Sequence, residues 1–246
     1  MNITSKGQSP FYPGQPVPTE FFAGRHKEIE RIDRAIQQVA AGKPQAIFLT
    51  GEYGIGKSSL AGFMRQSAEK NNRLLGIHVL LGGVETLDEL AEKTVSSFIR
   101  EQYYKPTFVD NLSEIFSKYL DEKQTLFGIN LNLKALKEDS PNISSGYLPF
   151  LREIYKKLAQ KINGIMLILD EINGITKEPK FSHFIKSLID ENALSPKPLP
   201  LLLTLCGVEE RRAEMVQNHR PVERIFDIVE INPMDKKEMK DFFTRY

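Results

Sequence analysis

The sequence has very little cysteine, no tryptophan and no long apolar run. Cys206 is the single cysteine among 246 residues, which excludes an intrachain disulfide and suits a reducing compartment. No apolar run approaches the roughly 20 residues that a membrane-spanning helix needs, and the first residues lack the apolar stretch of a signal peptide. We therefore expect a cytoplasmic protein with no membrane partner.

An excess of charge of either sign is also missing. Lysine and arginine number 33 against 32 aspartate and glutamate residues, a net charge of +1. This balance does not indicate a nucleic-acid or anionic-membrane partner, although a local basic patch stays open. The four histidines are scattered without the spacing of metal ligands. The length suits one large domain, or one domain with an appendage.

A phosphate-binding loop is the most specific motif present. After the apolar run 46–50 the chain reads Gly-Glu-Tyr-Gly-Ile-Gly-Lys-Ser, which is the pattern Gly-x-x-x-x-Gly-Lys-Ser. Its backbone N–H groups and the following helix N-terminus can surround a phosphate. Lys57 is expected to reach the terminal phosphates and Ser58 to bind Mg²⁺. The residues expected to hold the nucleotide here are Gly51, Glu52, Tyr53, Gly54, Ile55, Gly56, Lys57, Ser58 and Ser59.

A second acidic motif ends the apolar run Leu167–Leu169. The next two residues are Asp170 and Glu171, the form of a Walker B strand. We expect Asp170 to help hold Mg²⁺ and Glu171 to orient the attacking water, since phosphoryl transfer depends mostly on positioning and charge. The paired acids favour hydrolysis over small-molecule kinase chemistry. Residues 176–179 lack the aspartate of a guanine-reading Asn-Lys-x-Asp motif, so adenine is the expected base.

Strand-like and helix-like segments alternate along the chain, which indicates a parallel sheet covered by helices. We predict an α/β fold: a P-loop NTPase three-layer α/β/α sandwich with a mainly parallel, five-stranded core sheet. The expected strands are 45–50, 74–81, 165–169, 201–205 and 226–231, and the expected helices cover 29–39, 85–102, 110–120, 147–161 and 208–218.

Other segments have distinct compositions. Residues 1–20 are rich in proline and glycine and predict an extended arm. Residues 21–234 form the predicted nucleotide-binding domain, in which 110–146 is a candidate insertion. Within it, residues 126–133 alternate like a half-exposed strand, and 137–146 are polar and turn-rich.

The segment Phe22-Ala23-Gly24-Arg25-His26-Lys27-Glu28-Ile29 resembles the start of AAA+ ATPases in the origin-recognition-complex-like and STAND-like branches. Both Walker motifs follow in the order found in that family. Residues 222–234 resemble its arginine-containing turn, last strand and approach to the helical lid. The resemblance implies that Phe22, Gly24 and Arg25 lie beside the nucleotide.

The resemblance also implies residues that complete the site. A polar residue is expected near the end of the fourth strand, with Thr204 the first candidate and Cys206 the second. Arg224, or alternatively Arg220, is expected to act as an arginine finger on a neighbouring subunit. Residues 235–246 look like the start of a lid that is missing or only begun, so we expect a piece of a longer protein.

These observations favour an ATP-binding AAA+-type ATPase. It would bind Mg-ATP and hydrolyse it to drive assembly or the remodelling of a partner, as a homo-oligomer or with a protein partner. One alternative is a signalling or scaffold module that a bound nucleotide stabilises and that hydrolyses almost none of it. Another is a DNA-associated initiator or loader, which rests on analogy at the level of the fold alone.

Overall fold

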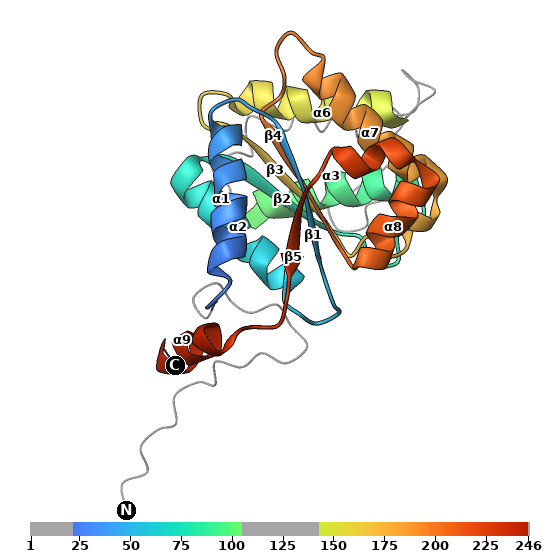
Figure 1. Ribbon diagram of the computed structural model, residues 1–246. Helices are drawn as coiled ribbons and strands as arrows, with labels where there is room; N and C mark the ends of the chain where they lie inside the picture. Colours follow the sequence, from blue (N-terminus) through green and yellow to red (C-terminus); the bar gives the residue numbers. More distant parts are fainter. Residues whose placement is uncertain (1–21, 105–142, 246) are drawn as a thin grey trace, which may run out of the picture.

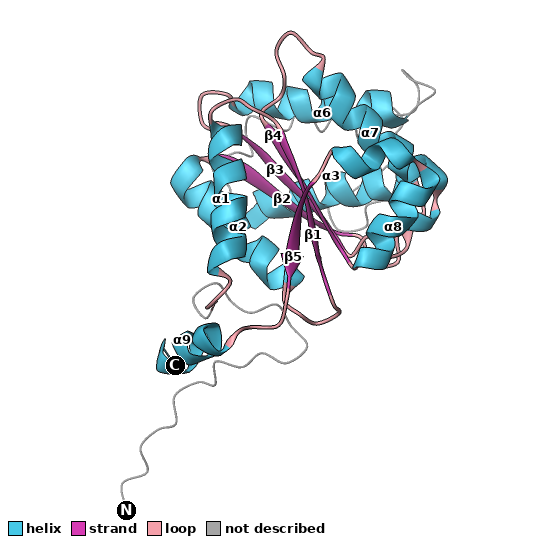
Figure 2. Ribbon diagram, in the orientation of Figure 1, coloured by secondary structure: helices cyan, strands magenta, loops and turns pink. Residues whose placement is uncertain are grey.

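The computed structural model describes residues 22–104 and 143–245. Five strands form one sheet in the order β2-β3-β4-β1-β5, and every neighbouring pair is parallel. The strands, magenta in Figure 2, are β1 (Gln45–Gly51), β2 (Leu74–Leu80), β3 (Gly164–Asp170), β4 (Leu201–Gly207) and β5 (Asp227–Ile231).

Helices cover both faces of this sheet (Figure 1). The α-helices are α1 (His26–Ala40), α2 (Lys57–Asn72), α3 (Leu87–Tyr104), α6 (Ile143–Leu158), α7 (Pro179–Ala193), α8 (Glu209–Asn218) and α9 (Lys236–Arg245). Two short 3₁₀ turns, η3 (Ile175–Lys177) and η4 (Arg220–Arg224), flank α7 and α8.

The core has two halves because the strands are buried on both faces. Alternate residues of β3 divide between them: Leu167 and Leu169 pack toward α3, α6, α7 and α8, while Met166 and Ile168 pack toward α1 and α2. All seven residues of β3 are buried, as expected for a central parallel strand. The predicted three-layer sandwich with a five-stranded parallel sheet is thereby confirmed.

The strand predictions agree with the structure to within two residues at each end, but two helical segments were not anticipated. No element was predicted for 179–193, which forms α7. Its residues Phe181, Phe184, Ile185 and Leu188 are buried at helical spacing. The prediction of turns for 137–146 was wrong from residue 143 onward, where α6 begins. The predicted arm 1–20, helix 110–120 and strand 126–133 lie outside the described residues.

The topology places the phosphate loop near the middle of the sheet. The loop follows β1, which lies between β4 and β5. Parallel strands share one carboxyl edge, where open α/β sheets bind their ligands. The segments that follow β1, β3 and β4 therefore meet at that edge.

No helix in the described ranges combines the length and the apolar composition required to cross a bilayer.

Candidate nucleotide site

The phosphate loop joins the end of β1 to α2. Gly51 has a φ of 151°, and a Cβ there would lie 2.7 Å from the Ile231 carbonyl oxygen of β5, so only glycine fits between the strands. Glu52, Tyr53 and Gly54 are exposed. Gly56 precedes α2 with a φ of 106°. The loop thus leaves its backbone open to solvent next to a helix N-terminus, an arrangement that favours anions.

Lys57, the first residue of α2, is folded back over the loop. Its Nζ donates to the carbonyl oxygens of Gly51 at 2.9 Å and Glu52 at 2.7 Å. The Tyr53 ring centroid lies 5.7 Å from the same nitrogen. Partial burial lowers the pKa of Lys57, and the negative charge of Asp170 opposes that shift. The lysine therefore lies within electrostatic range of the end of β3.

Asp170, at the end of β3, has both carboxylate oxygens engaged. It is 1% exposed. Its Oδ2 lies 3.0 Å from His78 Nε2, and its Oδ1 accepts a hydrogen bond from the Glu171 N–H at 2.9 Å. His78 on β2 was not among the predicted site residues, although a lone histidine inside the apolar run 74–81 was a usable signal.

Glu171 has a left-handed backbone, with a φ of 59°. For a residue with a Cβ this conformation costs about 1–2 kcal/mol, and the hydrogen bond to Asp170 helps to hold it. The side chain is exposed. A Cβ on Gly82, just after β2, would lie 2.5 Å from Glu171 Oε2, so the carboxylate occupies space that the glycine leaves open.

The oxygen donors near the loop suit Mg²⁺. Ser58 lies in the first turn of α2, directly after the phosphate loop, and Asp170 is the last residue of β3. Nowhere in 22–104 and 143–245 do three or more His, Cys, Asp or Glu side chains gather to hold a metal by themselves. Mg²⁺ commonly uses one or two protein oxygens, with substrate phosphates and waters completing its shell. Ser58 and Asp170 therefore fit a magnesium ion that arrives with a nucleotide.

Thr204 and Cys206, the two candidates for the polar residue expected near the end of the fourth strand, lie at different points along β4. Thr204 is 1% exposed, and within the described part its hydroxyl has no hydrogen-bond partner. It lies two residues, about 7 Å along the strand, before Cys206, whereas β4 ends at Gly207. Cys206 is buried within electrostatic range of Asp170 and Lys57, and burial raises the pKa of its thiol well above the ordinary value. Cys206, a neutral thiol, is thus the candidate nearer to the end of β4.

The predicted N-terminal residues pack against the loop and α9. Phe22 stacks on Phe63 of α2 with ring centroids 4.6 Å apart. The Arg25 guanidinium donates to the carbonyl oxygens of Ile55 at 3.1 Å and of Asn232. A Cβ on Gly24 would touch Glu238, and the Arg25 N–H donates to Glu238 Oε1 at 2.7 Å. Arg25 therefore joins the phosphate loop to the segment that leads into α9.

Arg220 and Arg224 lie away from these residues. Both are exposed and belong to η4, which precedes the first residue of β5. The phosphate loop lies beside the last residue of β5, because Gly51 pairs with Ile231. The two arginines are thus at the opposite edge of the sheet from the loop of their own chain.

Solved structures with this fold include two Aeropyrum pernix proteins. The ORC2 protein, solved as ADPNP-ADP complexes, has a TM-score of 0.58 and 14% identity, covering 97% of this chain and 54% of its own. The ORC1 protein, solved in complex with DNA, has a TM-score of 0.53 and 16% identity, covering 91% of this chain and 49% of its own. The chain spans about half the length of these structures. No curated protein sequence matches it.

The sequence profile described as "AAA ATPase domain" matches residues 22–215. This match covers most of the chain and includes the phosphate loop, Asp170 and Glu171. The chain therefore belongs to the AAA ATPase domain family.

Proposed function

We propose that this protein binds Mg-ATP at the carboxyl edge of the sheet and hydrolyses it. The observation that supports this most strongly is the convergence of three elements. Lys57 on the phosphate loop lies within electrostatic range of Asp170, and the backbone N–H of Glu171 is bonded to that carboxylate. Phosphoryl transfer needs a phosphate cradle, a metal-binding carboxylate and a residue that positions the nucleophile.

Binding requires Lys57 to exchange its partners. In the structure its ammonium group is bonded to two backbone carbonyl oxygens of the loop. The terminal phosphates would replace these neutral acceptors with charged ones, which form stronger hydrogen bonds. Ser58 and Asp170 would hold Mg²⁺, whose chemistry is to neutralise charge that builds up on the phosphates.

Glu171 is the proposed general base. Its carboxylate would orient a water molecule toward the terminal phosphorus. It would accept the water proton as the water oxygen bonds to that phosphorus and the bond from the phosphorus to ADP, the leaving group, breaks. The left-handed backbone of this exposed residue supports a functional role, since strained conformations concentrate at active sites.

The test separates binding from turnover. We expect Glu171→Gln to retain affinity for Mg-ATP and to lose hydrolysis by at least tenfold, with Glu210→Gln on the exposed surface of α8 as the control. Lys57→Ala should weaken nucleotide binding, whereas Lys70→Ala near the end of the same helix should not. Hydrolysis retained by Glu171→Gln would exclude its proposed role, and unchanged affinity in Lys57→Ala would exclude that of the lysine.

We further propose that Arg224 or Arg220 completes the site of a neighbouring subunit. Their position at the sheet edge opposite their own phosphate loop supports action in trans. The specific rate of hydrolysis should then rise with protein concentration, and alanine at the finger position should abolish that rise. A rate independent of concentration would indicate a self-contained site.

A second candidate function is a switch or scaffold that binds nucleotide but turns it over negligibly. The neutral, fully buried Cys206 at the end of β4 favours it, because a thiol is a weaker hydrogen-bond donor than a hydroxyl or an amide. This alternative predicts nucleotide that survives purification, and turnover equal to that of Glu171→Gln.

A further inference from the structure

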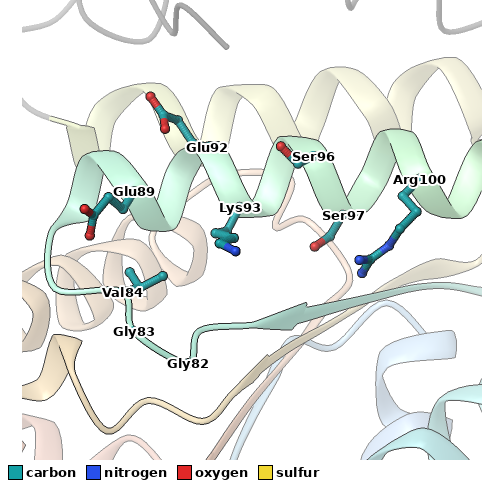
Figure 3. Close-up of a pocket in the computed structure, with 9 residues that line it drawn as sticks. All are labelled: Gly82, Gly83, Val84, Glu89, Glu92, Lys93, Ser96, Ser97 and Arg100. Atoms are coloured by element: carbon teal, nitrogen blue, oxygen red, sulfur yellow. The ribbon is translucent and has the colours of Figure 1, made fainter. Parts of the chain in front are cut away.

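A polar cavity lies beside the Gly82–Gly83 turn, which follows β2. It has a volume of about 460 Å³ and lies between this turn and α3 (Figure 3). This size falls within the usual range of small-molecule sites, about 300–1,000 Å³. Among its lining residues, Gly82 also lies against the Glu171 carboxylate of the nucleotide site.

One face of α3 supplies the polar groups of this cavity. Lys93, Ser97 and Arg100 follow the i, i+4, i+7 spacing that places side chains on one side of a helix. In Figure 3 all three point toward the Gly82–Gly83 turn, with Ser97 between the two cations. Lys93 and Arg100 are about 10 Å apart along the axis, and their long side chains can both reach the space below Ser97.

These three residues have no mutual or other polar partner in the described part of the chain. Ser97 is 5% exposed, yet no hydrogen bond involves its hydroxyl within residues 22–104 and 143–245. The same holds for the charged ends of Lys93 and Arg100. The Ser97 hydroxyl can therefore donate to a ligand group in the cavity without losing a protein partner.

Within the described residues, no ion pair joins the acidic residues that line the cavity to Lys93 or Arg100. Glu89 accepts hydrogen bonds from the backbone N–H groups of Glu85 at 2.8 Å and Thr86 at 3.2 Å, and these bonds lower its pKa. It is therefore bound at the start of the helix, about 16 Å along the axis from Arg100 and about 6 Å, one turn, from Lys93. Glu92 points away from the turn in Figure 3.

We propose that this cavity binds a small molecule carrying a phosphate monoester. The phosphate would lie between Lys93 and Arg100 and accept a hydrogen bond from Ser97. A phosphate monoester carries close to two negative charges at neutral pH, which matches two cations. The remaining carboxylate lone pairs of Glu89 would accept from hydroxyl groups at the other end of the ligand, as a sugar phosphate provides.

The experiment must keep this cavity distinct from the phosphate loop, which also attracts phosphate. Isothermal titration calorimetry would use the full chain saturated with Mg-ADP, titrated with ribose 5-phosphate and separately with glycerol 3-phosphate. Ribose is the uncharged control. If Mg-ADP itself fails to bind, the proposed nucleotide site is wrong. The same titrations of Lys57→Ala then still test this cavity.

We expect at least one of the two phosphates to bind in the presence of Mg-ADP, and ribose not to bind. The double variant Lys93→Met/Arg100→Met should weaken that binding at least tenfold and leave the affinity for Mg-ADP within twofold. The matched pair Lys43→Met/Arg34→Met changes two exposed cations elsewhere and should have no effect. Ser97→Ala should give a smaller loss, and Arg100→Gln provides a milder variant if the double variant melts early.

Three results would overturn the proposal. The first is that neither phosphate binds. The second is that Mg-ADP displaces the phosphate competitively, which would place it in the phosphate loop. The third is that the Lys93→Met/Arg100→Met variant, or Arg100→Gln where the double variant is unfolded, binds as tightly as the wild type.

Discussion

Replacing His78 by leucine should destabilise the protein through the buried carboxylate of Asp170. Asp170 is 1% exposed, and His78 Nε2 lies 3.0 Å from its Oδ2. Without this contact, Oδ2 has no other hydrogen-bond partner in the described residues. Leaving a buried polar group unsatisfied costs about 1–3 kcal/mol. The His78 side chain is 16% exposed, so water can reach the gap and the lower half of that range is expected.

The matched control is His78→Gln, because the glutamine amide nitrogen can occupy nearly the same place as Nε2 and donate to Oδ2. We expect it to lose less than half as much stability as His78→Leu. Urea unfolding without nucleotide or Mg²⁺ would supply both free energies of unfolding, provided that the m-values agree.

A double-mutant cycle isolates the contact from other effects of the leucine. In an Asp170→Asn background, His78→Leu should cost less by about 1 kcal/mol, since directly contacting residues couple by roughly 0.5–3 kcal/mol. If His78→Leu unfolds within about 0.5 kcal/mol of the wild type, or if its cost is the same in both backgrounds, the hydrogen bond does not stabilise Asp170 and the argument fails.

Three further substitutions test single contacts at the same edge of the sheet. Gly51→Ala should lower the free energy of unfolding by about 1–3 kcal/mol, because its Cβ would lie 2.7 Å from a backbone oxygen; a melting temperature equal to that of the wild type would contradict this. Gly82→Ala should displace the Glu171 carboxylate and slow ATP hydrolysis several-fold without weakening ADP binding. The control is Gly62→Ala on α2, which has nothing within 4 Å of the new Cβ and should leave the rate unchanged. A normal rate in Gly82→Ala would show that Glu171 adapts freely. Cys206→Ser replaces the thiol with a stronger hydrogen-bond donor and should raise the hydrolysis rate. The increase would be about fivefold if the hydrogen bond from the new hydroxyl stabilises the transition state by about 1 kcal/mol. An unchanged or lower steady-state rate would show that residue 206 does not take part in hydrolysis.

The secondary structure was largely readable because its signals are local. The apolar runs before the phosphate loop, before Asp170 and at 201–205 are too short for helices and became buried parallel strands. The missed helix α7 also carried a local signal. Pro179 at its first turn and Phe181, Phe184, Ile185 and Leu188 at helical spacing are features of a buried amphipathic helix, and the prediction overlooked them.

The candidate site was only partly predictable. The phosphate loop, Asp170 and Glu171 were identified because their chemistry depends on a fixed spacing along the chain. His78 could not be paired with Asp170 in advance, since they are 92 residues apart and meet only when β2 lies beside β3 in register. The choice between Thr204 and Cys206 likewise depends on where β4 ends, and strand boundaries are the least certain part of a sequence-based prediction.

The local amino-acid sequence thus specified which segments become strands and helices, and which residues can surround a phosphate. Folding in three dimensions determined the strand order, the partner of the buried Asp170, the use of Arg25 to join the loop to the segment before α9, and the cavity between α3 and Gly82–Gly83. The physical reason is the range of the interactions. Backbone propensity and motif spacing act between near neighbours in the sequence, whereas burial, hydrogen bonding and charge act between whichever groups the packed sheet and helices bring together.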